Sequence, residues 1–110
     1  MAVSEEYLAL VLDLLSGGLN VTSRRMFGGV GLYAEGFFFG LVAEDVLYLK
    51  VDDETRPDYE ARACERFRPY ADLRSMNYYT VPEDVLDDPD LLTAWARRAV
   101  GVAARSKRQP

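Results

Sequence analysis

The sequence predicts one α+β domain, in which an antiparallel β-meander of about four or more strands packs with an N-terminal helix, a short middle helix and a C-terminal helix. Two patterns support this. Apolar residues recur at helical spacing near both ends of the chain, whereas residues 24–51 alternate as strands do and are interrupted by short turns. The 110 residues, 49% of them hydrophobic, suffice for one core, so we expect one domain over residues 1–110, ordered at about 4–104.

The first predicted helix spans residues 4–16. Ser4 can cap its N-terminus, and two glutamates follow where the helix dipole favours negative charge. Its leucines form an unusually broad apolar stripe, which indicates burial against a sheet or contact with a second subunit. Gly17 and Gly18 provide the stop.

Three strands are predicted in the first half of the chain, at residues 24–33, 37–42 and 46–51. Glycines inside the first of them indicate a bulge or a bend. In the second strand, strict alternation places Phe37, Phe39 and Leu41 on one face. One face of the third strand is wholly apolar and the other is mixed, so we expect helices on one side of the sheet and solvent or a partner on the other.

In the second half of the chain, the sequence pattern predicts three short elements and a long final helix. The short elements are a middle helix from near Pro57 to about 64–66, a strand at 76–81 and a single turn at 82–85, and the final helix runs from 88 to about 104. We expect Tyr59, Ala63 and Phe67 to form the inner face of the middle helix. The basic tail, residues 105–110, is expected to fray.

The charge distribution argues against nucleic acid as a direct partner. The net charge is −5, and all 18 acidic residues lie at or before Asp90, whereas every charged residue after it is basic. An acidic body repels phosphate backbones. We therefore expect direct nucleic-acid binding to be disfavoured.

The chain contains no histidine, which removes the most common general base and metal ligand and excludes Ser-His and Cys-His nucleophilic sites. Cys64 is the single cysteine, so no intrachain disulfide can form, as is usual in a reducing compartment. No signal-peptide pattern and no apolar run of roughly 20 residues is present. We expect a cytoplasmic protein without membrane contact, enzymatic activity, cofactor or metal.

Several stretches resemble the N-terminal domain of the TfoX/Sxy family. They are RRMFGGVGLY at 24–33, FFFGLVAEDVLYLKVD at 37–52, MNYYTVPEDVL at 76–86 and LLTAWARRAV at 91–100. The resemblance extends from about residue 7 to 104. It implies an α+β fold with an antiparallel sheet and a link to regulators of DNA uptake and natural competence in bacteria. It supplies no reaction and no ligand. Those regulators also carry a helical C-terminal domain, and we expect this chain to be a stand-alone version. The structural signature comprises Met26, Phe27, Gly28, Gly29, Gly31 and Gly40.

Arg24 and Arg25 are the first candidate contacts. Neighbouring residues on a strand point to opposite faces, so at most one guanidinium can face the core side. A structural role would pair that arginine with Asp52 or Asp53 at the end of the third strand. A functional role would be an anion or partner contact. The structural role is favoured, because the chain has more carboxylates than basic groups and one is therefore available to pair with the arginine.

Tyr78, Tyr79 and the three phenylalanines at 37–39 are candidates for an aromatic platform. Bases stack on such platforms when basic residues run alongside, and the nearby ones are few: Lys50, Arg24 and Arg74. Core packing combined with a subunit interface is the favoured interpretation.

Three further patterns are interpreted as structural. The glycines at 28, 29 and 31 lack the spacing of a nucleotide-binding loop and are not followed by a helix, so they predict a bend. The acidic clusters at 52–54 and 84–90 lie at helix N-termini and lack calcium-loop spacing, so they predict caps. Cys64 is expected to be a small buried side chain, although neighbouring arginines could lower the pKa of an exposed thiol.

Together these features predict a non-enzymatic regulatory or protein-interaction module that forms a homodimer. Two alternatives remain open. One is a nucleic-acid-associated transcriptional or competence regulator, and the other is a domain that binds a small anion near Arg24 and Arg25.

Overall fold

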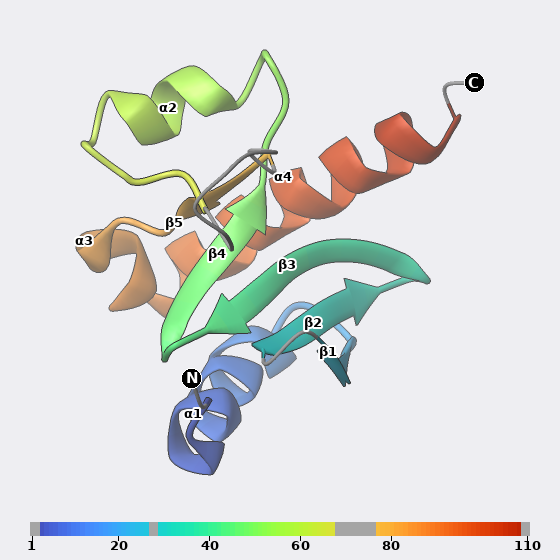
Figure 1. The fold of residues 1–110 in the computed structure, drawn as a ribbon, viewed down its shortest axis with the longest axis vertical. Helices are drawn as coiled ribbons and strands as arrows, with labels where there is room; N and C mark the ends of the chain where they lie inside the picture. The colour runs from blue at the N-terminus through green and yellow to red at the C-terminus, as the bar shows by residue number, and fades with distance from the viewer. Residues whose placement is uncertain (1–2, 27–28, 68–76, 109–110) are drawn as a thin grey trace.

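The computed structural model describes residues 3–26, 29–67 and 77–108 (Figure 1). Its elements, in chain order, are α1 (Glu5–Ser16), β1 (Val21–Met26), β2 (Gly29–Ala34), β3 (Phe37–Ala43), β4 (Val46–Lys50), α2 (Arg56–Glu60), β5 (Tyr78–Thr80), α3 (Glu83–Leu86) and α4 (Pro89–Arg108). The fold class is α+β, as predicted. Among the described residues, no helix combines the length and the apolar character that crossing a membrane requires.

The five strands form one antiparallel sheet in the order β1-β2-β3-β4-β5, so every strand pairs with its neighbour in sequence. The meander is therefore confirmed. The prediction of a single strand at residues 24–33 is wrong, because β1 and β2 pair with each other and Met26 lies opposite Gly29. The predicted bend within one strand is instead the reversal between two strands. Phe27 and Gly28 lie outside the described residues.

A β-bulge shifts the register between β2 and β3. Leu32 pairs with Gly40, but the next residue, Tyr33, pairs with Phe38. Phe39 is therefore the extra residue on β3, and the direction of its neighbours' side chains changes there.

The predicted assignment of β3 side chains to the two faces of the sheet is wrong, because the bulge interrupts their alternation. Strict alternation groups Phe39 with Leu41 and Phe38 with Gly40. In the structure, Phe39 is fully buried in the core, whereas Leu41 pairs with Tyr48 on the opposite face of the sheet. The prediction for β4 is confirmed: its apolar positions are buried, and its mixed face is only partly covered.

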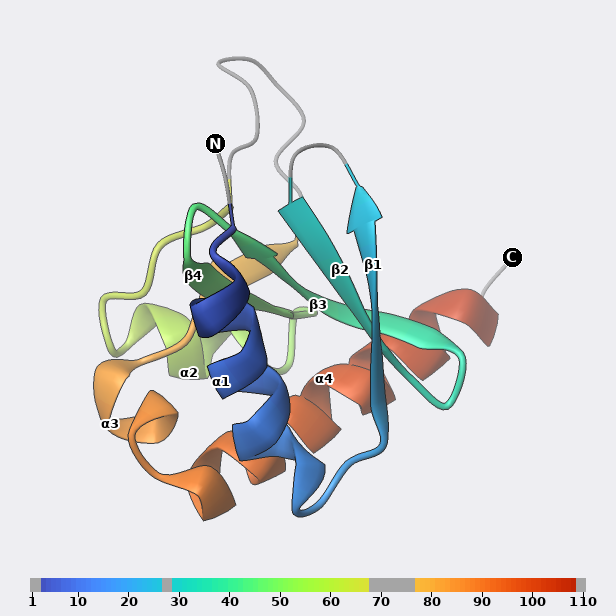
Figure 2. The ribbon, with the colours of Figure 1, turned by 90° about the horizontal axis from the view of Figure 1, so that it is seen from below.

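Helices α1 and α4 cover one face of the sheet (Figure 2). The core joins the buried residues of both helices to the strand residues that face them: Val11, Leu15, Val30, Leu32, Phe39, Val42, Leu47, Leu49, Leu92, Ala96 and Ala99. Helix α1 begins as predicted, because the hydroxyl of Ser4 accepts a hydrogen bond from the backbone N–H of Tyr7 at 3.1 Å. This arrangement places helices on one side of the sheet, as the mixed pattern of β4 predicts.

Several element boundaries differ from the predictions. Helix α2 ends at Glu60, and Ala63 is exposed with φ +58°, so Ala63 is not on an inner helical face. Its buried anchor is Tyr59, whose ring packs edge-to-face with that of Trp95, with the two ring centroids 4.7 Å apart. Helix α4 continues to Arg108 rather than ending near 104. Strand β5 and the single turn α3 lie where they were predicted, although β5 is shorter.

Candidate functional site

A row of three aromatic rings crosses the sheet face opposite the helices. Tyr33 on β2 stacks on Phe38 of β3 with ring centroids 5.2 Å apart. Phe38 also packs on Tyr78 of β5, with centroids 5.6 Å apart. We call Tyr33, Phe38 and Tyr78 the aromatic row. Tyr33 and Phe38 are half-buried and Tyr78 is buried, so the row combines a fixed end with a more accessible end.

The row lies where β3 and β4 separate. Their pairing ends at Gly40 and Leu49, although β3 begins at Phe37 and β4 ends at Lys50. Figure 1 shows β3 curving away from the end of β4, with α4 running behind both strands. The bulge at Phe39 causes this divergence, because a bulge bends and twists the strand that carries it.

Lys50 adds a positive charge to the aromatic row. Its ammonium group lies 5.6 Å from the centre of the Tyr78 ring, within range of a cation–π interaction. Burial lowers the pKa of Lys50 below its usual value. Burial also raises the pKa of Tyr78 to about 12, with a smaller contribution from Tyr33, so its hydroxyl remains protonated and can donate a hydrogen bond.

Two adjoining hollows form a groove along the aromatic row, here called the Lys50 groove. The larger has a volume of about 610 Å³ and is lined by Phe38, Lys50, Val51, Asp52, Asp53, Asn77, Tyr78 and Ser106. The smaller, about 310 Å³, shares Phe38, Lys50 and Ser106 with it and extends to Tyr33. Both volumes fall in the range of ligand pockets, about 300–1,000 Å³. The described lining of the groove therefore combines ring faces with the cation of Lys50 and several hydrogen-bonding groups.

The two carboxylates of the groove are each paired with an arginine. Arg105 of α4 donates to Asp52 at 2.7 Å, and Arg56 is bonded to Asp53. The ion pairs found among the described residues all involve arginine, and none includes Lys50. Lys50 is thus the charge in the groove that the described residues leave uncompensated.

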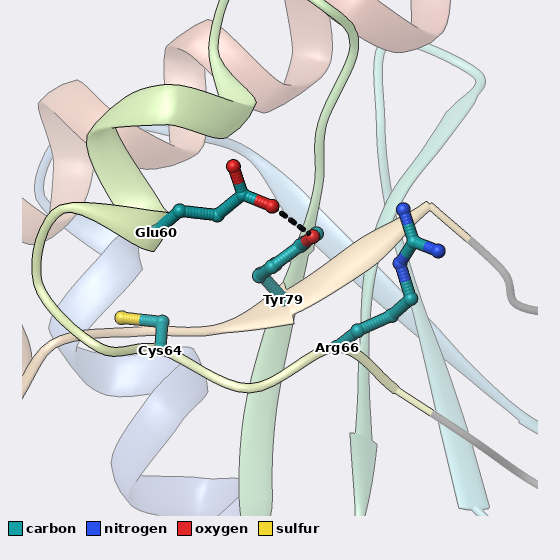
Figure 3. Close-up of a pocket in the computed structure, with 4 residues that line it drawn as sticks. All are labelled: Glu60, Cys64, Arg66 and Tyr79. Atoms are coloured by element: carbon teal, nitrogen blue, oxygen red, sulfur yellow. Dashed lines mark hydrogen bonds between the residues drawn. The ribbon is translucent and has the colours of Figure 1, made fainter.

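A second pocket lies between the end of α2 and β5 (Figure 3). Its volume is about 530 Å³, and it is lined by Glu60, Cys64, Arg66 and Tyr79. The Tyr79 hydroxyl donates to Glu60 at 2.9 Å, and the Arg66 guanidinium lies 5.6 Å from the centre of the Tyr79 ring. The thiol of Cys64 points away from Arg66 (Figure 3). Burial raises the pKa of Cys64 and outweighs the opposing effects of Thr80 and Arg62, so the thiol is poorly ionised.

The structure separates the predicted platform residues. Tyr78 and Phe38 belong to the aromatic row, whereas Phe39 and Tyr79 lie in the core on the other face. Lys50 joins Tyr78, as the predicted set implied. Arg74 lies outside the described residues.

Arg24 and Arg25 lie on β1, an edge strand, and both are exposed. The predicted pairing of one of them with Asp52 or Asp53 is wrong, because those carboxylates bind Arg105 and Arg56. The two arginines instead lie on the edge strand of the described sheet, where charge discourages pairing with another chain. The structure does not bring either arginine into the Lys50 groove.

The acidic cluster at 84–90 includes a helix cap, as predicted, whereas the cluster at 52–54 caps the turn before α2, because the N-cap of α2 is Thr55 and makes no side-chain cap bond. One carboxylate oxygen of Asp52 accepts the backbone N–H groups of Glu54 and Thr55, each at 3.0 Å. Asp88 does the same at the start of α4, accepting from Asp90 and Leu91. Gly29 and Gly31 lie in β2, which continues to Ala34 as a strand, so no helix follows them as a nucleotide-binding loop requires.

Sequence reasoning missed Tyr33, Asn77 and Ser106 as parts of the groove. Tyr33 was detectable in part, because it is the last aromatic residue before the first hairpin turn. Ser106 carried no local signal. It reaches the groove because α4 extends past residue 104 and crosses behind the end of β4.

The sequence model of the TfoX N-terminal domain matches residues 13–103 of this chain. The chain belongs to this family. All four strands that surround the Lys50 groove lie inside the matched range. The TfoX N-terminal domain is therefore the unit that carries both the aromatic row and the charge beside it.

A curated member of the family shares a shorter stretch with this TfoX N-terminal domain. Over 62 residues the chain is 39% identical to the "DNA transformation protein TfoX1" of Aliivibrio fischeri. The match covers 54% of this chain and 30% of the relative. Most of the relative's length therefore has no counterpart in the aligned region.

Proposed function

We propose that this TfoX N-terminal domain takes part in the control of DNA transformation as a non-enzymatic protein-interaction module. The observation that carries the proposal is the aromatic row beside Lys50. Aromatic rings that converge on a groove, with a cation at the edge, are typical of surfaces that bind another protein. The family and the name of the relative supply the process.

The composition supports a binding role rather than a catalytic one. The chain has no histidine, and the single thiol has a raised pKa. Nucleophilic catalysis depends on an activated nucleophile, usually one next to a base. The Lys50 groove instead presents ring faces and hydrogen-bond donors, which recognise a surface without reacting with it.

The same groove favours a protein partner over nucleic acid. Single-stranded nucleic acid binds where stacked rings are accompanied by a track of basic residues. Among the residues that the structure describes, one lysine lies beside the rings and two acidic residues line the same groove, and the chain carries a net charge of −5. A protein segment satisfies this mixture better than a phosphate backbone.

We also propose that the domain forms a homodimer through α1. Leu10 on α1 is 51% exposed and is one of two large hydrophobic residues that project into solvent among the described residues. Leu8, Leu12 and Leu14 of the same helix are partly buried and pack against the core, so the surface offered to a second copy is centred on Leu10. Self-association buries an exposed apolar residue of this kind. Sedimentation at tens of micromolar should show a dimer for the wild type and a monomer for Leu10→Glu. A monomeric wild type would end the dimer proposal.

Transformation frequency in the source bacterium tests the regulatory role. Deletion of the gene should change the frequency of DNA uptake, and the wild-type gene should restore it. A Phe38→Thr variant, which removes the centre of the aromatic row while keeping a strand-forming residue, should fail to restore it at equal protein level. The matched control is Tyr48→Thr, which removes a ring on the same sheet face that packs on Phe67 instead. An unchanged frequency on deletion would contradict the proposal.

A further inference from the structure

We propose that the Lys50 groove binds an acidic peptide segment in which a carboxylate lies next to an aromatic side chain. This inference rests on the proposed function as a protein-interaction module and specifies the chemistry of the partner. Three features of the groove carry it: its local charge, its ring faces and its length.

The local charge selects a carboxylate. Asp52 and Asp53 are matched by Arg105 and Arg56, so the described part of the groove retains the single positive charge of Lys50. The Lys50 side chain is half-buried, which weakens its hydration and strengthens its attraction for an anion. A partner carboxylate placed here completes an ion pair that residues 3–26, 29–67 and 77–108 do not supply.

The ring faces select an aromatic side chain beside that carboxylate. Tyr33 and Phe38 stack almost in parallel, with an angle of 25° between their planes, and remain half-buried. A third ring from a partner can pack against this partly accessible pair. Its contribution to the binding free energy exceeds that of the apolar area it buries, because aromatic pairs also interact through their ring geometry. The Tyr78 hydroxyl and the Asn77 amide can bond to the backbone of the same segment.

The length of the groove selects a peptide rather than a compact small molecule. The two hollows adjoin at Phe38, Lys50 and Ser106, so they form one path from the hairpin of β2 and β3 to the start of β5. An extended segment places successive side chains along such a path. Lys50 lies where the two hollows meet, which puts the partner carboxylate in the middle of the segment.

Titration of a peptide pair tests this chemistry. The probes are acetyl-Gly-Glu-Trp-Gly-amide and its Gln counterpart, which differ only in the charge of one side chain. Binding is followed by amide chemical shifts of the full chain. We expect the Glu peptide to bind about fivefold or more tightly than the Gln peptide, with shifts concentrated at the groove.

Variants separate local charge from net charge. Lys50→Gln should remove the preference for the Glu peptide, and Lys50→Arg should retain it. Arg25→Gln removes the same charge from an exposed position on β1 and should leave the preference intact. Far-ultraviolet circular dichroism establishes that each variant is folded.

Three outcomes would overturn the inference: equal binding of the two peptides, a preference that survives in Lys50→Gln, or shifts that map outside the groove. If indole-3-acetate alone bound as tightly as the Glu peptide, the groove would be a small-molecule site and the peptide assignment would be wrong. The peptide titrations use the purified chain and are therefore independent of the transformation experiment. If neither peptide binds the groove but deletion of the gene still changes the frequency of DNA uptake, the interaction surface lies elsewhere on the domain.

Discussion

A methyl group at Gly40 would lie 2.9 Å from the backbone carbonyl oxygen of Tyr48. The two residues belong to neighbouring strands, and the side chain of Leu49 would be 3.2 Å from the same methyl group. Gly40 is also where the pairing of β3 and β4 ends, before the strands diverge toward the aromatic row. The absence of a side chain at position 40 therefore lets the two strands approach beside the groove.

Gly40→Ala should destabilise the fold by about 1–3 kcal/mol, the usual effect of an added methyl group in a packed site. The carbonyl of Tyr48 is backbone and cannot rotate away, so β3 or β4 has to shift. Gly17→Ala is the control, because a methyl group there meets nothing within 4 Å and the backbone φ is −72°. Urea unfolding should leave Gly17→Ala within about 1 kcal/mol of wild type or slightly more stable. Equal stability of Gly40→Ala and wild type would contradict the close approach.

The ion pair between Asp52 and Arg105 ties the last turns of α4 to the end of β4. Asp52 also caps the turn that follows β4 through two backbone N–H groups. We expect Asp52→Asn to lower the free energy of unfolding by about 1 kcal/mol at neutral pH, because a charged acceptor is replaced by a neutral one. Arg105→Gln should have a smaller effect, since that side chain is about half exposed. Chemical unfolding of both single variants and the double variant measures the coupling. If the losses of the two single variants add up to the loss of the double variant, the ion pair contributes nothing to the free energy of unfolding.

The contribution of Asp52 should depend on pH. The hydrogen bond from Arg105, together with those from the backbone of Thr55 and Glu54, lowers the pKa of Asp52 below its ordinary value of 3.8. A carboxyl whose pKa is lower in the folded state stabilises the fold fully above its unfolded pKa, and this stabilisation is lost as the pH falls through the folded pKa. The stability difference between wild type and Asp52→Asn should therefore be constant above about pH 5 and shrink below pH 4. A difference that grew with acidification would contradict the sign.

Cys64 should react slowly with thiol reagents. Burial raises its pKa, so the thiolate fraction at pH 7.5 is smaller than that of free cysteine. The rate of iodoacetamide alkylation should lie below that of an unstructured cysteine peptide at pH 7.5 and rise as the pH exceeds 9. Alkylation followed by mass spectrometry in native buffer and in urea makes the comparison. Faster reaction in the native state than in urea would show an activated thiol instead.

Arg24 and Arg25 should be unimportant for stability. Both are exposed on the edge strand β1, and the ion pairs of the described residues do not include them. Arg24→Gln and Arg25→Gln should each change the free energy of unfolding by no more than about 0.5 kcal/mol. Thermal unfolding measures this. A much larger loss in one of the variants would instead support the structural role predicted from the sequence for one of the two arginines.

The sequence contained enough information for the meander, the helix caps and the covered face of the sheet. Leu47, Leu49 and Val51 alternate without interruption, and their burial follows directly from that pattern. Ser4 and Asp88 cap their helices through local hydrogen bonds, which depend on only a few neighbouring residues. Local signals of this kind need no knowledge of the rest of the fold.

The site depended on contacts that local patterns do not encode. The strand register that makes Phe39 a bulge is set by pairing with β2, and three consecutive phenylalanines look the same with or without it. The glycines near position 29 suit a bulge and a chain reversal equally well. Arg105 binds Asp52 although the two residues are 53 positions apart in the sequence. No local pattern indicates that pair, so the sequence led to the wrong prediction that Arg24 or Arg25 is the partner.

The aromatic row beside Lys50 is the surface through which we propose that the domain contacts another protein. Photo-crosslinking in the living source bacterium tests it most directly, with p-benzoylphenylalanine placed at position 38 in one strain and at position 25 in another. We expect a protein adduct from position 38 that disappears in the Lys50→Gln background, and none from position 25. Adducts that form from position 25 but not from position 38, or that persist without Lys50, would contradict it.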